Sequence, residues 1–457
     1  MAILDILATG RSGLLAQQRA LRTNGTNIAN VNTPGYSRQR TVFEAVPASG
    51  GYGVRVSAVE QIVDEFLESR LLGQSSSAAG ATARRDLLAA VEELFPVGDT
   101  SVGGALQEFF AAASELATHP EDLAVRNDLL DRAEVLASKL RDAAQGLEQI
   151  QREADDRVAA GAGDVNRLLE KIAGLNKGIM RDEGTGGSAN ELRDQRRAAL
   201  GELAGLIGVR TVEHTDGSVD VFTRSGLGLV SGGDASRVEA RLSTSLGLDG
   251  AALHDVGVVA PDDSLIALGS DPGGEIGARL TVRDSDVQGT AADLDLLALT
   301  LRDTVNAVQT NAAGRDLDGL VGSALFAGTG ASDLTVALTD PRGLAAAQST
   351  VSGDNANALE LIGLQGATQG ALAGATLGDY FGTVQTRVGG AVRDAEDAAT
   401  VEDSLLASVA AQRDAVSGVS LEEEFTELVR YQRAFQASAQ LISVGDSLLQ
   451  ELIGMVR

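Results

Sequence analysis

The sequence predicts a mostly α-helical protein with an inserted β domain and long helices at both ends. Apolar residues recur every seven positions near both termini, which is typical of coiled-coil-like helices. Short Val-rich runs separated by turns interrupt the helical pattern in the middle of the chain. Residues 1–60 and 418–457 are expected to form an end domain with a β-hairpin, 61–208 and 286–417 a helical bundle domain, and 209–285 a small all-β insertion.

The first helix carries one strictly apolar column. Its members lie seven residues apart, and they are Leu7, Leu14, Leu21 and Ile28. The neighbouring column is mixed, and it contains Ile3, Gly10, Gln17, Asn24 and Val31. One apolar column beside a mixed one indicates a narrow seam, because a helix buried in a globular core shows a wider apolar stripe.

The last helix carries a longer apolar column, made of Leu421, Leu428, Phe435, Ile442, Leu449 and Val456. Ser420 and Glu423 have the spacing of a capping box, so this helix should run from about Ser420 almost to Arg457. The two apolar columns are predicted to form an assembly seam, in which the terminal helices pair with each other and with neighbouring subunits. The alternative is that both are ordinary amphipathic helices of one bundle.

A polar turn follows the first helix, and its residues are Asn27, Asn30, Asn32, Thr33, Pro34, Gly35 and Tyr36. Pro34-Gly35 is the pair that a type II turn favours at its central positions. Because Pro34 restricts Thr33 to an extended conformation, the first helix should end near Asn32. The Asn side chains can hydrogen-bond free backbone groups at such a helix end. Alternating residues in 41–46 and 54–59 predict a β-hairpin after the turn.

The middle of the chain changes texture several times. The expected elements are helices from 61 to 208 with a loop at 182–188, short strands over 209–280, a helix over 290–311, a Gly-rich strand-like stretch to 341, and a long helix over 380–417.

Composition argues against several function classes. A net charge of −27 disfavours nucleic acid and anionic membranes as partners. The chain has no Cys, so it holds no disulfide and no thiolate metal site. Its three His are not at ligand spacing, and it has no phosphate-loop or nucleophile-elbow motif. Solvation explains acidic pairs such as Asp316 and Asp318 better than calcium binding. We therefore expect no cofactor, no metal and no enzyme.

Membrane insertion is not expected either, because no run of about twenty uncharged apolar residues exists. The first residues lack the basic region and cleavage site of a secretory signal peptide. A protein of this kind that leaves the cell would do so without cleavage of its N-terminus.

The turn residues carry a family resemblance. Residues 27–36, Asn-Ile-Ala-Asn-Val-Asn-Thr-Pro-Gly-Tyr, resemble the signature of the flagellar axial proteins of rod, hook and hook-associated type. The extension Ser37-Arg38-Gln39 and residues 11–14, 418–424 and 431–439 are similar to the type 1 hook-associated members of that family.

The resemblance implies a structural subunit at the junction between hook and filament, assembled through paired terminal helices after type III export. It implies as partners further copies in a ring, the hook protein, hook-associated protein type 3 and an export chaperone, and an extracellular location on the flagellum. Two alternatives remain: another axial protein of the hook or rod, or a secreted binding module that has axial-protein ends and carries its function in the β insertion.

Overall fold

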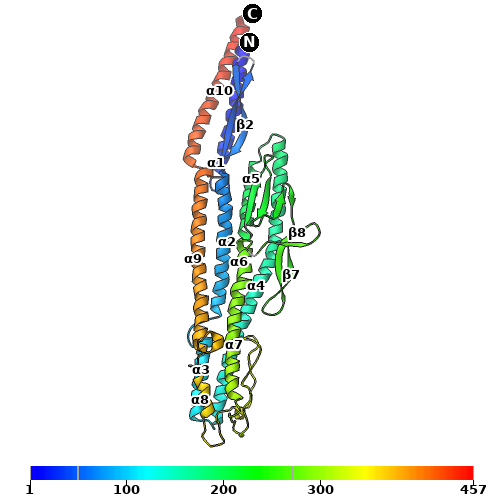
Figure 1. Ribbon diagram of the computed structural model, residues 1–457. Coiled ribbons are helices and arrows are strands. Elements are labelled where there is room, and N and C mark those ends of the chain that lie inside the picture. The colour runs from blue at the N-terminus through cyan, green and yellow to red at the C-terminus, as the bar shows by residue number, and fades with distance from the viewer. Residues whose placement is uncertain (1, 49–50, 270, 456–457) are drawn as a thin grey trace. The chain divides into compact units, whose positions relative to one another are not determined.

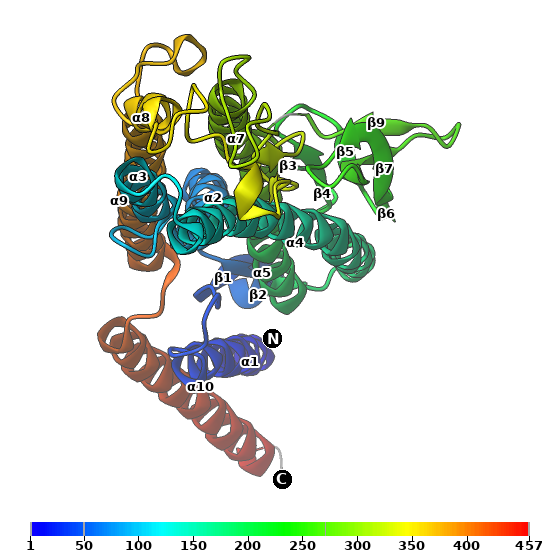
Figure 2. The same ribbon diagram turned by 90° about the horizontal axis from the view of Figure 1, so that it is seen from below.

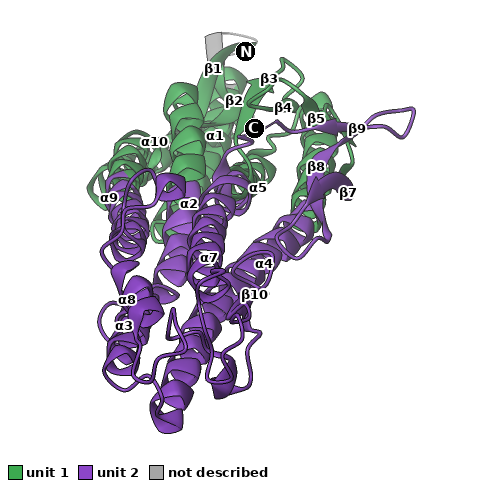
Figure 3. Ribbon diagram, turned by 60° about the horizontal axis from the view of Figure 1, so that its bottom comes forward, with its two compact units in different colours: residues 1–78, 163–238, 402–457 green, residues 79–162, 239–401 purple. Residues whose placement is uncertain are grey.

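The computed structural model describes residues 2–48, 51–269 and 271–455, and it confirms the predicted fold class. The chain divides into two compact units, of which unit 1 comprises 1–78, 163–238 and 402–457, and unit 2 comprises 79–162 and 239–401 (Figure 3). Helices α2 (Glu65–Glu93), α4 (Leu123–Gly184) and α9 (Leu377–Ser417) contribute residues to both units. The domain boundaries expected from the sequence stay a prediction.

Both ends of the chain belong to one group of elements in unit 1, which we call the terminal arm. It consists of α1 (Ala2–Ala29), β1 (Gln39–Ala48), β2 (Gly51–Gln61) and α10 (Leu421–Met455). Helices α1 and α10 lie side by side and antiparallel (Figures 1 and 2). The two strands pair antiparallel, with an irregularity between Val42 and Phe43. The predicted hairpin and last helix are confirmed, whereas α1 ends slightly before Asn32 because a turn begins at residue 30.

Glycines let α1 and α10 approach closely. A Cβ atom at Gly10 would lie 2.9 Å from Ile442 Cγ1 and 3.3 Å from the Ser438 carbonyl oxygen. A Cβ atom at Gly445 would lie 2.8 Å from Leu7 Cδ2. Because real Cβ contacts are longer than these, any larger residue would push the two helices apart.

The remainder of unit 1 holds α5 (Asn190–Leu206) and a sheet in the order β3-β4-β5-β6. The strands are β3 (Val209–Glu213), β4 (Val219–Thr223), β5 (Gly228–Ser231) and β6 (Asp234–Ala235). Asn176 on α4 holds this sheet, since its Nδ2 donates to Val219 O at 2.8 Å and to Gly232 O at 2.6 Å. A buried amide that bonds both β4 and the turn between β5 and β6 fixes the distance of the sheet from the helix.

Unit 2 contains the large apolar core, built mostly from Leu, Ala and Val. Besides parts of α2, α4 and α9, its helices are α3 (Val102–Thr118), α6 (Gly274–Thr281), the π-helix η1 (Val282–Asp286), α7 (Val287–Gln309), α8 (Ala356–Gly363) and the short 3₁₀ helices η2 (Pro341–Gly343) and η3 (Gly370–Leu372). Phe109 stacks edge-on with Phe110 at 5.3 Å between ring centres, and it lies 6.0 Å from Phe326.

The expected strand region from 209 to 280 is wrong at its end. Strands β7 (Val238–Leu246), β8 (Ala252–Val259) and β9 (Leu265–Ala267) form a second sheet, and residues 274–281 are helical. Gly274 has a positive φ and begins α6. It lies so close to Gly80 that a Cβ atom added at Gly80 would be 3.0 Å from the Gly274 carbonyl oxygen. The turn motif before 274 therefore leads into a helix, which the glycines allow to pack closely.

The strand-like stretch expected up to residue 341 is also wrong for most of its length. The stretch holds only the short strand pair β10 (Phe326–Ala327) and β11 (Thr335–Val336) and an isolated bridge from Arg315 to Ala347. The side chain of Asn306 on α7 accepts hydrogen bonds from the backbone of Leu325 and Phe326 and donates to Phe326 O. A side chain thus replaces the sheet partner that this segment would otherwise need.

Among the helices of the described ranges, none is long and apolar enough to cross a membrane.

A first prediction concerns the close approach of α1 and α10. A methyl group added at Gly25 of α1 would meet no atom of another element within 4 Å, so Gly25→Ala should stabilise α1 by up to about 1 kcal/mol. Gly10→Ala should instead weaken the pairing, because its Cβ meets the Ser438 backbone. Hydrogen exchange of α1 and α10 amides should slow in the first variant and speed up in the second. Equal protection in both would contradict the close contact.

Candidate functional site

The turn after α1 adopts the predicted type II geometry. Tyr36 N donates to Thr33 O across the turn at 3.2 Å, and Gly35 has φ of 77°, which that turn position requires. Asn30 Nδ2 donates to Thr26 O at 2.9 Å, while Asn32 is exposed. The turn brings Tyr36 back against α1.

Asn27 joins α1 to the beginning of β1, and it is only 1% exposed. Its Oδ1 accepts from Tyr36 Oη at 2.8 Å and from Gln39 N at 3.0 Å. Its Nδ2 donates to Gln39 O at 2.9 Å and to Glu424 Oε2 at 3.1 Å. The amide therefore uses both its donor and its acceptor groups, and one of its bonds reaches α10.

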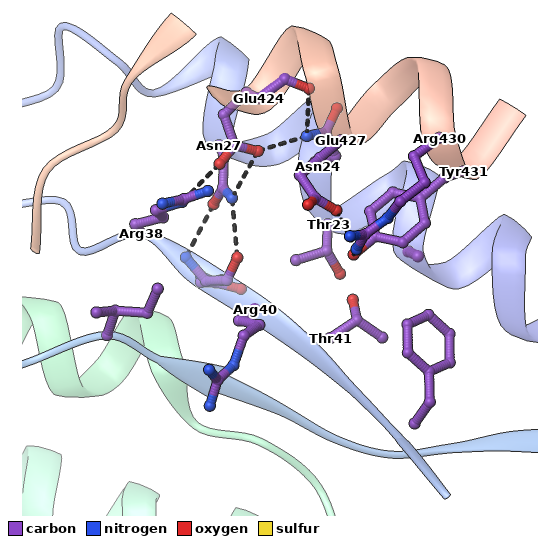
Figure 4. Close-up of a pocket in the computed structure, with 14 residues that line it drawn as sticks. Thr23, Asn24, Asn27, Arg38, Arg40, Thr41, Glu424, Glu427, Arg430 and Tyr431 are labelled. Carbon is purple, nitrogen blue, oxygen red and sulfur yellow. Dashed lines mark hydrogen bonds and ion pairs between the residues drawn. The ribbon is translucent and has the colours of Figure 1, made fainter. Parts of the chain in front are cut away.

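Glu424 of α10 accepts the last of these bonds, and it is 2% exposed. Its Oε1 accepts from Arg38 Nε at 2.7 Å, and its Oε2 accepts from Asn24 and Asn27. Asn24 Nδ2 also donates to the Glu424 backbone oxygen at 2.9 Å. We call Asn24, Asn27, Tyr36, Arg38 and Glu424 the polar clamp, and Figure 4 labels Asn24, Asn27, Arg38 and Glu424. A buried carboxylate without partners costs several kcal/mol, so Glu424 fixes where these groups must lie.

The environment keeps two members of the clamp in their hydrogen-bonding forms. Burial raises the pKa of Tyr36 above 10.0, and the charges of Asp194 and Glu424 act in the same direction. Burial lowers the pKa of Arg38, but hydrogen bonds and charges of Glu424 and Glu423 outweigh it, so the pKa is raised overall. Tyr36 thus stays a neutral donor, and Arg38 stays a cation.

A hollow of about 300 Å³ lies beside the clamp, between α1, β1 and α10. Thr23, Thr41 and Glu427 line it together with clamp residues. The Tyr431 ring of α10 lies 6.1 Å from the Phe43 ring of β1, which holds the hairpin against α10, and 5.0 Å from Arg430 Cζ of its own helix. Among the residues that line this hollow there is no His or Cys, and the described part of the chain shows no group of acidic and His side chains that could hold a metal ion. The contacts around this hollow hold α1 and the hairpin against α10.

Small and polar residues form the centre of the contact between α1 and α10. Gly10 faces Ser438, and Asn24 bonds to Glu424. On α10, Glu424, Ser438 and Gly445 are separated by multiples of seven residues, so they share one face. The mixed column of α1, which contains Gly10 and Asn24, therefore lies at the helix contact.

The predicted apolar columns flank this centre. Their half-buried members are Leu7, Leu14, Leu21, Ile28, Leu428, Phe435, Ile442 and Leu449. Leu421 is 42% exposed, and Val456 lies outside the described residues. The role of these columns as an assembly seam stays a prediction.

Sequence analysis missed a second apolar stripe on α10, which is exposed. Its members are Leu441, Val444, Leu448, Leu452 and Met455, between 39% and 77% exposed. Their spacing of three and four residues places them on one face of the helix. The stripe begins only in the second half of α10. The positions seven and fourteen residues before Leu441 are Ala434 and Glu427, so the seven-residue column that contains Leu441 is not apolar along the whole helix.

Comparison with known proteins identifies the family. The model of the flagellar hook-associated protein FlgK helical domain matches residues 88–326, more than half of the chain. The chain belongs to the FlgK family of flagellar hook-associated proteins. This family consists of structural components of the flagellum. The terminal regions match two further models, flagella basal body rod protein at residues 7–36 and flagellar basal body rod FlgEFG protein C-terminal at 411–455.

Curated relatives of the FlgK family match this chain over almost their whole length. The chain is 26% identical to flagellar hook-associated protein 1 of Salmonella typhimurium, covering 97% of this chain and 98% of that protein. It is 27% identical to the protein of the same name from Bacillus subtilis, covering 98% and 97%. The solved structure of the flagellar hook junction protein FlgK from Burkholderia pseudomallei has the same fold, with a TM-score of 0.69 at 15% identity, and covers 76% of this chain and 100% of that one.

A second prediction follows from the raised pKa of Tyr36. The folded clamp favours the neutral phenol, so its contribution to stability is fully present below pH 10 and is lost as pH rises above it. Tyr36→Phe should cost about 1 kcal/mol below pH 10, because the bond to Asn27 is lost, and should reduce the alkaline loss. Thermal unfolding of both proteins on either side of pH 10 measures this. Parallel pH curves would show that Tyr36 does not titrate with folding.

Proposed function

We propose that this chain is the structural subunit between the hook and the filament of a bacterial flagellum, and that it assembles there through its terminal helices. The observation that carries the proposal is the exposed stripe on α10, a long apolar surface on a helix that the polar clamp already ties to α1. Exposed contiguous apolar surface on a folded chain indicates an interaction site. The names of the relatives support the junction as its place.

The helical domain favours the junction subunit over a hook or rod subunit. The two ends match models of rod proteins, as the ends of axial proteins in general would, whereas residues 88–326 match the FlgK helical domain. A secreted binding module with borrowed ends is the other alternative. It is disfavoured because the family match includes the helices and strands between the ends.

Two different surfaces of the terminal arm support assembly into a ring. On α1, Leu4 and Leu15 are 65% and 54% exposed and share a face with exposed Arg11 and Arg22. On α10, the exposed carboxylate of Glu451 lies beside the apolar stripe. Copies that join through two unlike surfaces form a head-to-tail contact, which closes into rings or continues as helices. The hook protein and hook-associated protein type 3 would then lie on the two sides of the ring.

The same exposed stripe gives a physical reason for a chaperone. Before assembly, an apolar helix face would self-associate, so an export chaperone that covers α10 would keep the subunit single. We further propose type III export without a cleaved signal peptide, and an extracellular position on the flagellum.

A third prediction tests the stripe by placing a glutamate at either of two adjacent positions in separate variants. Leu448→Glu places a carboxylate in the stripe and should prevent retention of filaments, whereas Ser447→Glu places it on another face of α10 and should not. Phe435→Glu, in the half-buried column, should also prevent it. The readout in the native host is filament protein on cells against filament protein in the medium. Thermal unfolding should show that unit 2 remains folded in all three variants.

A fourth prediction tests the function itself by removal of residues 421–457. Filament protein should then appear in the medium while hooks remain on the cells, because the junction subunit is no longer held in place. Filaments that grow and stay attached as before would refute the proposed function. Complementation with the full chain is the control.

A further inference from the structure

The terminal arm is attached to the rest of unit 1 mainly by individual polar side chains. Within the arm, α1 packs along α10 and along both strands. Towards α5 and α9, the arm makes hydrogen bonds through single residues. Apolar packing tolerates sliding, whereas hydrogen bonds fix direction, so these few bonds determine where the arm points.

Ser37, directly after the signature turn, lies at the centre of this attachment. It is 0% exposed, and its Oγ accepts from Arg197 Nη2 of α5 at 3.2 Å and from Arg413 Nη2 of α9 at 3.4 Å. Arg413 Nη2 also donates to Gly35 O at 3.3 Å. A third bond to α9 comes from the backbone, since Arg38 N donates to Ser417 O at 2.8 Å.

Each of the two arginines is held from both sides. Arg197 donates to Gln61 Oε1 of β2 at 2.7 Å and to Asp194 Oδ1 of its own helix at 2.5 Å. Arg413 donates to Glu68 Oε1 of α2 at 3.1 Å and to Asp414 Oδ1 at 3.0 Å. Because a guanidinium presents its donors in a rigid plane, each arginine fixes an angle between the groups that it joins.

A reciprocal pair of bonds completes the attachment at the end of the hairpin. Gln61 Nε2 donates to Asn190 O at 2.8 Å, and Asn190 Nδ2 donates to Val59 O at 2.9 Å. This pair ties β2 to the first residue of α5. It leaves rotation about the tie open, which the arginines on either side of Ser37 restrict.

We infer that Ser37, Arg197 and Arg413 form a positioning joint that sets the direction of the terminal arm relative to α2, α5 and α9. The joint leaves the pairing of α1 with α10 to the polar clamp and controls only where the arm points. This inference rests on the proposed function in one respect, since the direction of the arm decides where a neighbouring subunit meets the α10 stripe. The joint itself is a property of the single chain.

The absence of Cys from the sequence makes the joint measurable by spin labelling. Labels at Ser447→Cys on α10 and Glu202→Cys on α5 report the direction of the arm, because both positions are exposed. With the native joint, electron–electron distance measurements should give one narrow peak. The double variant Arg197→Gln/Arg413→Gln should lose that peak and give a broad or shifted distribution. An unchanged peak overturns the inference.

Two controls separate loss of direction from loss of folding. A label pair inside the arm, Gln18→Cys with Ser447→Cys, should keep its distance distribution in the double variant. Arg167→Gln removes an arginine of the same unit that is 69% exposed and should leave both distributions unchanged. If the pair inside the arm also changes, the variant Arg197→Lys/Arg413→Lys decides, because lysine keeps the charge but has no planar fork. A native peak in that variant also overturns the inference.

The measurement uses the purified full chain and needs neither hook nor filament. A failed junction assay after removal of 421–457 would therefore leave the joint standing. Conversely, an unchanged peak in the arginine variants would leave the proposed function standing.

Discussion

The carboxylate of Glu424 is the group on which the terminal arm depends. A buried charge must find donors, and Asn24 and Asn27 of α1 and Arg38 after the turn provide them. Their positions in turn require the type II turn, because only a sharp reversal returns Tyr36 and Gln39 to Asn27. A single desolvated group thus accounts for the asparagines at positions 24 and 27 of α1 and for the Pro-Gly turn that follows them.

Local features could be predicted from the sequence, and those set by helix rotation could not. The turn, the hairpin and α10 follow from Pro-Gly chemistry, alternation and a seven-residue repeat, which act over a few residues. Glu424 stands in a run of three glutamates, and nothing in that run marks the one that is buried. The rotation of α10 about its axis decides this, and the contact of Gly10 with Ser438 sets that rotation. The predicted end of the strand region was wrong for a similar reason, since Gly274 packs against Gly80, which is distant in the sequence.

The division of labour on α10 follows from the same rotation. Small and polar side chains occupy the face towards α1, because a close approach leaves no room for larger ones. Large apolar side chains are therefore displaced to the flanks and to the outer stripe from Leu441 to Met455. Leu7 still contacts Gly445, but the large apolar side chains of the outer stripe stay available for other helices, which is the arrangement that the proposed assembly needs.

The charge distribution also supports the proposed assembly through the arm. Unit 2 contains 38 acidic and 16 basic residues, whereas unit 1 contains 26 and 21. Surfaces as acidic as that of unit 2 repel one another at distances within the Debye length. In the proposed ring, contacts between second units would therefore contribute little, and attraction would come from surfaces with balanced charge and exposed apolar area. Helices α1 and α10 provide both, since α1 carries more Arg than acidic residues and α10 carries the opposite excess together with the apolar stripe.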